Sequence, residues 1–169
     1  MWANGRGQTF LPHPTTLLPT YLKFVRGRLM NKKQVIFLCT GNSCRSQMAE
    51  GLVNHYLGDE WQAYSAGTEP AGYVHPMAVE AMSELEIDIS RNSSKSVDEF
   101  RHTDFDLVVT VCDDASENCP VWFGPEKVVH ISFPDPAKAE GDVMERLAIF
   151  QRVRDDIGVR VLNYLQESA

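Results

Sequence analysis

The chain has 169 residues, of which 43% are hydrophobic and 23% charged, values typical of one globular domain. The first 33 residues hold six basic and no acidic side chains, which leaves ten basic and 23 acidic side chains, a net −13, for the remainder. Because an acidic body repels phosphate backbones and no apolar run approaches the roughly 20 residues of a membrane span, we expect neither nucleic acid nor a membrane as a partner.

The N-terminal segment, residues 1–29, is predicted to be a flexible extension that precedes a single domain at residues 30–169. Three prolines interrupt the segment, so it lacks the continuous apolar core of a secretory signal. Its basic, acid-free composition is also compatible with a targeting peptide. Met30 is an alternative first residue of the chain. Four cysteines in this length are too few for a disulfide framework and suit the reducing cytoplasm, where we expect the protein.

Strands and helices are predicted to alternate along the domain. Continuous apolar runs indicate buried strands, and apolar residues at helical spacing indicate helices. In chain order we expect a strand at 35–38, a helix at 46–57, a strand at 61–67, a helix at 76–85, a short helix near 96–101, strands at 107–112 and 127–133, and a closing helix at 142–166. This order predicts an α/β fold, a four-stranded parallel sheet with helices on both faces. Sites in such sheets lie at the carboxyl ends of strands, where Cys39, Cys112 and the loop after Phe133 fall.

The loop between the first strand and the first helix has the composition of an anion-binding site. Its backbone amides and the helix N-terminus favour negative charge, and Gly41 and Asn42 tolerate the positive φ that a tight loop needs. Arg45 can hold an oxyanion through two parallel hydrogen bonds. The same field is predicted to lower the pKa of Cys39, with Ser46 donating to its sulfur, so that Cys39 acts as a nucleophile. The alternative, a buried structural cysteine, leaves Arg45 and Ser46 unexplained. The predicted oxyanion cradle consists of Thr40, Gly41, Asn42, Ser43, Cys44 and Arg45.

These residues resemble those of a known family. The stretch "CTGNSCRSQMAEG" (39–51) is similar to the catalytic loop of the low-molecular-weight tyrosine phosphatases, and more closely to that of their thioredoxin-coupled arsenate reductase branch. The resemblance implies a low-molecular-weight tyrosine phosphatase-like fold, and we expect a monomer. It runs from about Lys33 to the C-terminus and includes "YSAG" (64–67), "IDIS" (87–90), "VVTVCDDASENCP" (108–120), "DPA" (135–137) and "FQRVRDDI" (150–157).

The resemblance implies reduction of arsenate to arsenite through three cysteines. In this scheme Cys39 attacks arsenate and Asp135 protonates the departing hydroxide. Cys112 then attacks the Cys39 sulfur and arsenite is released; Cys119 attacks Cys112, and thioredoxin reduces the final disulfide. Phosphate and sulfate are the expected analogues of arsenate, and no bound cofactor or metal is implied. Cys44 is predicted to pack or to shape the loop.

The spacing of Cys112 and Cys119 carries a physical constraint. If the segment between them were helical, their backbones would lie about 10.5 Å apart, whereas a disulfide tolerates at most about 7 Å. We therefore predict that this segment rearranges when it is oxidised.

Two other functions remain open from the sequence. A phosphatase acting on small phosphoesters needs only Cys39, Arg45 and Asp135. Aromatic residues usually follow the Asp-Pro pair in phosphotyrosine-specific relatives, whereas Ala137 and Lys138 follow it here, which disfavours phosphotyrosine. The second alternative is a non-catalytic oxyanion-binding regulatory module. Within the reductase hypothesis, glutathione with glutaredoxin is an alternative reductant to thioredoxin.

A position beside the loop bears on metal binding. Some relatives hold a monovalent cation there with Asn, Glu and Ser residues that match Asn42, Glu50 and Ser65, together with an acid after "IDIS". Lys95 takes the place of that acid. We predict that its ammonium group substitutes for the cation and that the protein needs no potassium.

Overall fold

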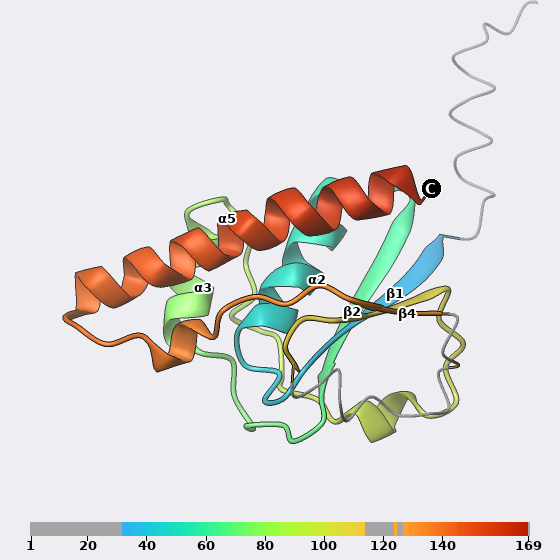
Figure 1. Ribbon diagram of the computed structural model, residues 1–169, viewed down its shortest axis with the longest axis horizontal. Helices are drawn as coiled ribbons and strands as arrows, with labels where there is room; N and C mark the ends of the chain where they lie inside the picture. The colour runs from blue at the N-terminus through green and yellow to red at the C-terminus, as the bar shows by residue number, and fades with distance from the viewer. Residues whose placement is uncertain (1–31, 114–123, 125–126, 169) are drawn as a thin grey trace, which may run out of the picture. The chain divides into compact units, whose positions relative to one another are not determined.

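The computed structural model describes residues 32–113, 124 and 127–168, so the predicted extension 1–29 and Cys119 lie outside the described residues. Its four strands, β1 Lys33–Cys39, β2 Trp61–Gly67, β3 Leu107–Thr110 and β4 Val128–His130, form one parallel sheet in the order β2-β1-β3-β4 (Figure 1). The predicted strands are all present. The predicted four-stranded parallel sheet is therefore confirmed.

The three α-helices of the described chain are α2 Arg45–Tyr56, α3 Pro76–Ser83 and α5 Val143–Glu167. Helix α5 begins with a capping box, in which the Asp142 side chain accepts from the Glu145 backbone and the Glu145 side chain accepts in return. The short helix expected near 96–101 is a 3₁₀ turn, η1 Val97–Phe100, and a second turn, η4 Pro136–Lys138, follows β4. Helix α2 packs against α5, α3, β1 and β2.

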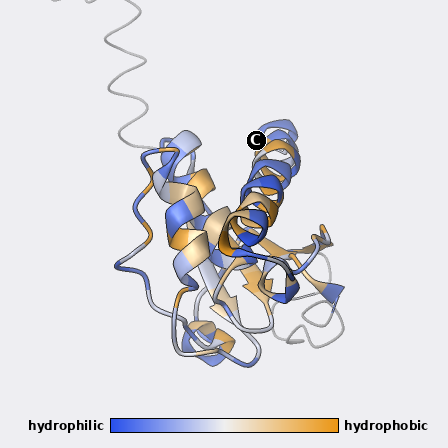
Figure 2. Cartoon of the chain, turned by 90° about the vertical axis from the view of Figure 1, so that its left-hand side faces the viewer, coloured by the Kyte–Doolittle hydropathy of each residue, from blue (hydrophilic) through white to orange (hydrophobic). Residues whose placement is uncertain are grey.

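Both faces of the sheet are covered, as the contacts of successive side chains along β2 show. Successive side chains of a strand point to opposite faces. Ser65 hydrogen-bonds Glu50 of α2, whereas the ring of Tyr64 makes edge contacts with Phe100 and Phe105 at centroid distances of 5.9 and 5.5 Å. Helices therefore cover one face, and η1 with the segment after it covers the other. Apolar colour concentrates between these layers in Figure 2.

The strand register brings distant residues together at the carboxyl edge of the sheet. Cys39 pairs with Gly67 of β2, and Leu38 pairs with Thr110 of β3. Beyond the ends of β3 and β4 the pairing continues, because Val111 N donates to Leu38 O and Phe133 N donates to Val111 O. The residues that follow β1, β3 and β4 consequently meet at one edge.

No helix in the described part of the chain is both long enough and apolar enough to cross a membrane.

Candidate active site

The loop at residues 40–44 curls around the sulfur of Cys39. Asn42 has φ 45° and directs its backbone N–H to Cys39 Sγ at 3.1 Å. The prediction of positive φ is thus met at Asn42. Gly41, which tolerates such a φ as well, is not among the described glycines of positive φ. Helix α2 starts at Arg45, so its N-terminus faces the loop.

A buried hydrogen-bond network ends on the Cys39 sulfur. Ser46 Oγ lies 2.9 Å from Cys39 Sγ and accepts from Asn42 Nδ2 at 2.9 Å, which leaves the hydroxyl proton of Ser46 for the sulfur. Asn42 Nδ2 also donates to Ser65 Oγ at 2.9 Å, and Ser65 donates to Glu50 Oε2. The sulfur is thereby linked through three polar side chains to a carboxylate of α2.

Burial dominates the electrostatics of Cys39, which is 3% exposed. Desolvation raises the pKa of the Cys39 thiol above its ordinary value, while the hydrogen bonds with Ser46 and the charge of Arg45 act in the opposite direction. The predicted lowering of this pKa is therefore wrong for the protein alone. The reason is that the strand end is covered by the loop, which the sequence pattern does not reveal.

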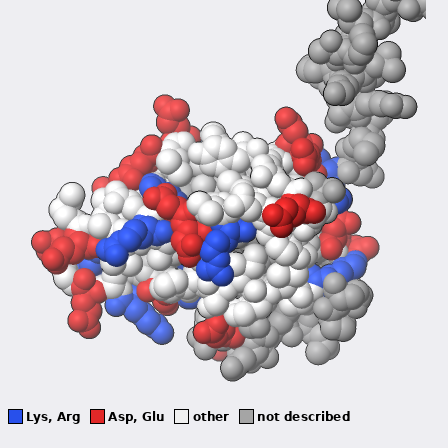
Figure 3. Space-filling model, turned by 45° about the horizontal axis from the view of Figure 1, so that its top comes forward, with Lys and Arg blue, Asp and Glu red and all other residues white. Residues whose placement is uncertain are grey.

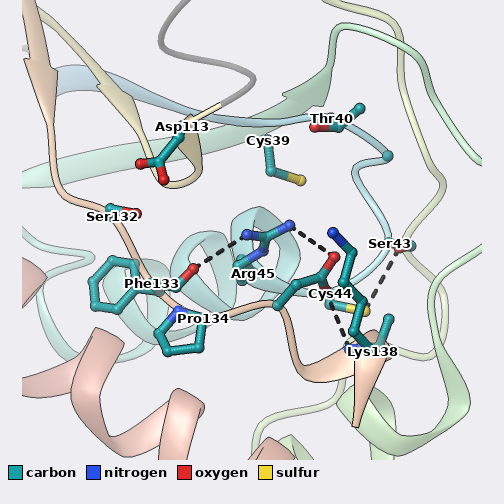
Figure 4. A pocket seen from close by; sticks show the side chains of 13 residues that line it. Cys39, Thr40, Ser43, Cys44, Arg45, Asp113, Ser132, Phe133, Pro134 and Lys138 are labelled. Atoms are coloured by element: carbon teal, nitrogen blue, oxygen red, sulfur yellow. Dashed lines mark hydrogen bonds and ion pairs between the residues drawn. The ribbon is translucent and has the colours of Figure 1, made fainter.

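Arg45 and Asp135 form an ion pair in a pocket of about 750 Å³. Figure 4 shows Arg45 in this pocket, below Cys39 and Thr40. Arg45 Nη2 lies 3.3 Å from Asp135 Oδ2, and Arg45 Nη1 donates to Phe133 O at 3.2 Å. Asp135 also caps η4 by accepting from Ala137 N at 3.2 Å. The guanidinium is thus oriented from two sides, and the Asp135 carboxyl group lines the same pocket as Cys39.

Cys112 lies beside the loop, as the strand order predicts. Its sulfur is 3.5 Å from Thr40 Oγ1, and the residue is 4% exposed. Cys44 is also a free thiol, and burial raises its pKa to about 12. Cys119 lies outside the described residues. Among the described residues, no group of three His, Cys, Asp or Glu side chains is arranged to hold a metal ion.

Two residues that support the loop were missed by the sequence analysis. A Cβ at Gly67 would lie 2.6 Å from Thr40 O and 3.0 Å from Asn42 N, so only glycine lets β2 approach this closely. Gln47 Nε2 donates to Asn42 Oδ1 at 3.0 Å and to Ser93 O at 2.9 Å, joining the loop to the segment before η1. For Gly67, the glycine at the end of the strand "WQAYSAG" was a sequence signal of close approach. No sequence pattern indicated the role of Gln47.

Lys95 lies at the far end of the network. Its Nζ is 3.5 Å from Glu50 Oε2, and its backbone N donates to Asn42 Oδ1 at 2.7 Å. Asn42, Glu50, Ser65 and Lys95 are therefore brought together. The potassium-independence predicted from them stays a prediction.

Comparison with known proteins agrees with this geometry. Residues 34–168 match the family model described as low molecular weight phosphotyrosine protein phosphatase. The chain is 53% identical, over 137 residues, to an arsenate reductase of Halalkalibacterium halodurans, a match that covers 81% of this chain and 98% of the relative. The chain belongs to the arsenate reductase branch of the low molecular weight phosphotyrosine protein phosphatase family.

Solved structures of that branch have the same fold. An arsenate reductase in the phosphate-binding state has a TM-score of 0.70 and 33% identity, covering 81% of this chain and 99% of its own. An arsenate reductase in the oxidised state has a TM-score of 0.68 and 30% identity, covering 81% and 99%. These likenesses confirm the predicted low-molecular-weight tyrosine phosphatase-like architecture and identify the protein as an enzyme of this branch.

Proposed function

We propose that this enzyme reduces arsenate to arsenite with Cys39, Cys112 and Cys119 and that thioredoxin restores the thiols. The observation that carries the proposal is the position of a second buried thiol, Cys112, beside the oxyanion loop, with its sulfur 3.5 Å from Thr40 Oγ1. A phosphatase has no use for that thiol. A reductase needs it, because two electrons must reach arsenic.

In the proposed first step, the Cys39 thiolate attacks arsenic while the loop amides and Arg45 bind the remaining oxygens. Arg45 lies within reach of this anion because Asp135 and Phe133 O hold its guanidinium in the pocket. Once the bound anion has taken over the charge of Arg45, Asp135 takes up a proton and gives it to the departing hydroxide, which leaves as water. A bond between sulfur and arsenic replaces one bond between arsenic and oxygen, and arsenic remains pentavalent.

In the second step, the Cys112 thiolate attacks Cys39 Sγ. The disulfide between Cys39 and Cys112 forms, the sulfur–arsenic bond breaks, and its electron pair stays on arsenic, which leaves as arsenite. Cys119 then attacks the Cys112 sulfur and Cys39 departs as a thiolate. Two thiols of thioredoxin reduce the remaining disulfide, which returns the enzyme to its starting state.

A coupled assay tests the proposal. Purified protein with arsenate, thioredoxin, thioredoxin reductase and NADPH is expected to oxidise NADPH only when arsenate is present. The rate should vanish in Cys39→Ser, Cys112→Ser and Cys119→Ser. Cys44→Ser, matched in chemistry, should retain most of it because the backbone amide that residue 44 contributes to the cradle is unchanged. Arsenate-dependent turnover that persists in Cys112→Ser would overturn the relay. Replacing thioredoxin with glutathione and glutaredoxin identifies the donor.

Phosphatase activity is the second candidate, favoured by the meeting of Cys39, Arg45 and Asp135 in one pocket. Hydrolysis of p-nitrophenyl phosphate that survives loss of both Cys112 and Cys119, with no arsenate-dependent turnover, would support it. Tight phosphate binding without either activity would instead indicate an oxyanion-binding regulatory module.

The relay also bears on the state of the protein in the cell. Cys39 and Cys112 come from one chain, so a monomer suffices for the first two steps. Free thiols are maintained in a reducing compartment, which supports the cytoplasm as the proposed location.

A further inference from the structure

Asp113, the residue after Cys112, is joined to the sheet by a chain of side-chain hydrogen bonds. His130 Nε2 lies 3.0 Å from Asp113 Oδ1, and His130 Nδ1 lies 2.8 Å from Thr110 Oγ1. Thr110 is fully buried and pairs in register with Leu38 of β1 and His130 of β4. The exposed Asp113 is thereby connected to a buried residue inside the sheet.

This chain of contacts fixes Cys112 from its C-terminal side. On the N-terminal side, Val111 N donates to Leu38 O at 2.8 Å, which is the last backbone contact between β1 and the strand β3 extended by one residue. Cys112 therefore lies between Val111, which is held by the backbone of the sheet, and Asp113, which is held through its side-chain carboxylate. Asp113 lines the same pocket as Cys39, on the side opposite to Lys138 (Figure 4).

The hydrogen-bond donors are determined by the chemistry of the groups. A carboxylate only accepts, so the proton between His130 and Asp113 belongs to Nε2. The Thr110 hydroxyl can donate to or accept from Nδ1, so the chain forms with a neutral or a charged imidazole. Hydrogen bonds from Ser132 and His130 also hold the pKa of Asp113 below its ordinary value, which keeps the carboxylate ionised.

We propose that Thr110, His130 and Asp113 form a tether that positions Cys112 against the loop for attack on the Cys39 sulfur. His130 and Asp113 are thus positioning residues, and their role rests on the proposed function. Asp113 and His130 are 78% and 37% exposed, so the contact is weak enough to open when the segment beyond Cys112 rearranges.

The tether can be measured without arsenate. In the Cys119→Ser background, oxidised glutathione converts the Cys39 and Cys112 thiols into one disulfide and releases two reduced glutathione molecules. The equilibrium in glutathione redox buffers, read by mass spectrometry with peptide mapping, gives the effective concentration of one thiol at the other. Asp113→Ala is expected to lower this value by about three- to fivefold, the upper part of the range for an exposed charge pair.

A pair of histidine variants separates positioning from folding. His130→Asn retains an amide near the place of Nδ1 but does not reach Asp113, and it should lower the effective concentration as Asp113→Ala does. His130→Gln places its amide near Nε2 and should restore the value. Asp104→Ala removes another exposed carboxylate, which pairs with Lys127 outside the pocket; it is the matched control and should leave the value unchanged.

The kinetic counterpart uses arsenite release in a single turnover of the Cys119→Ser protein. Asp113→Ala should slow release by about the same factor without changing the arsenate concentration for half-saturation. Equal effective concentrations in Asp113→Ala, His130→Asn and Asp104→Ala would overturn the tether. If the Cys119→Ser protein without further substitution released no arsenite, the proposed function would be overturned instead. The glutathione measurement would still decide whether the tether exists.

Discussion

Cys39 experiences opposing influences whose balance governs its reactivity. Burial favours the neutral thiol, whereas the Ser46 hydroxyl, the Asn42 amide and Arg45 favour the thiolate. Because burial has the larger effect, the pKa lies above its ordinary value, and the thiolate fraction rises with pH until that raised pKa is passed. A group with a raised pKa is proton-bound in the folded state, so its contribution to stability is lost as pH rises above the ordinary thiol value.

Ser46→Ala is therefore expected to raise the pKa of Cys39 further. Each unit of increase lowers the thiolate fraction about tenfold at a fixed pH below the pKa. The measurement is the alkylation rate of Cys39 by iodoacetamide against pH, in the Cys112→Ser, Cys119→Ser background. Ser43→Ala, whose hydroxyl contacts Cys44 instead, is the control. A profile of Ser46→Ala that superimposes on the background profile would contradict the assigned role of Ser46.

Lys95 supplies the positive charge at the other end of the Cys39 network. It and Glu50 are 21% and 17% exposed, so neither charge is well hydrated and each depends on the other. The expected result is that replacing sodium by potassium at constant ionic strength leaves the rate of arsenate reduction unchanged. Lys95→Ala should lower that rate about tenfold, with partial recovery in potassium, because the Glu50 carboxylate is left unpaired. Strong potassium activation of the unsubstituted protein would refute the prediction.

Strand β2 packs against the loop and limits how far the loop can move. Gly67 pairs with Cys39, and Gly67 N donates to Lys95 O at 2.8 Å, so the end of β2 cannot move away from the loop freely. A methyl group at this position meets a backbone carbonyl and a backbone amide rather than a flexible side chain. The loop would have to move, and its backbone amides would no longer point toward one anion.

Gly67→Ala is accordingly expected to lower the rate of arsenate reduction by about 100-fold, the cost of a displacement near 1 Å in an active site. Gly158→Ala on α5 is the control, because its Cβ would meet only Leu52 Cδ1, at 3.9 Å. Thermal unfolding checks that both variants are folded. A Gly67→Ala enzyme with the full rate would show that the loop is not held by β2.

At the scale of the whole molecule, α5 is the longest described helix, and it packs against α2, α3 and η4. Acidic and basic side chains alternate over the face that contains it (Figure 3). One basic residue of α5, Arg154, is instead buried: it donates to Ala81 O at 2.5 Å and lies 2.9 Å from Glu84 Oε2 and 2.8 Å from Asp155 Oδ1. It therefore connects α5 to α3.

Arg154→Met is expected to lower the free energy of unfolding by about 2 kcal/mol, since the Ala81 carbonyl loses a charged donor in a buried place. Arg152→Met, an exposed position on the same helix, should change it by less than about 0.5 kcal/mol. Urea denaturation followed by circular dichroism measures both. Equal stabilities of the two variants would contradict the assigned role of Arg154.

Much of the candidate site was predictable because its parts are close in the sequence. Cys39, Asn42, Arg45 and Ser46 lie within eight residues, and a strand-loop-helix pattern places their polar groups together for local reasons. The parallel sheet was also predictable, because apolar runs alternate with helical segments and connections between parallel strands obey few topologies. Together, these two patterns predicted that Cys112 and Asp135 lie at the same edge of the sheet as Cys39.

The sequence by itself thus determined the sheet, the loop and the family resemblance. Only the tertiary structure decided how deeply Cys39 is buried, which reversed the expected direction of its pKa shift. It also decided that Gly67 touches the loop and that His130 meets Asp113. These properties depend on atoms far apart in the chain. Desolvation and close approach are set by what packs over a group, and no local pattern of residues encodes that.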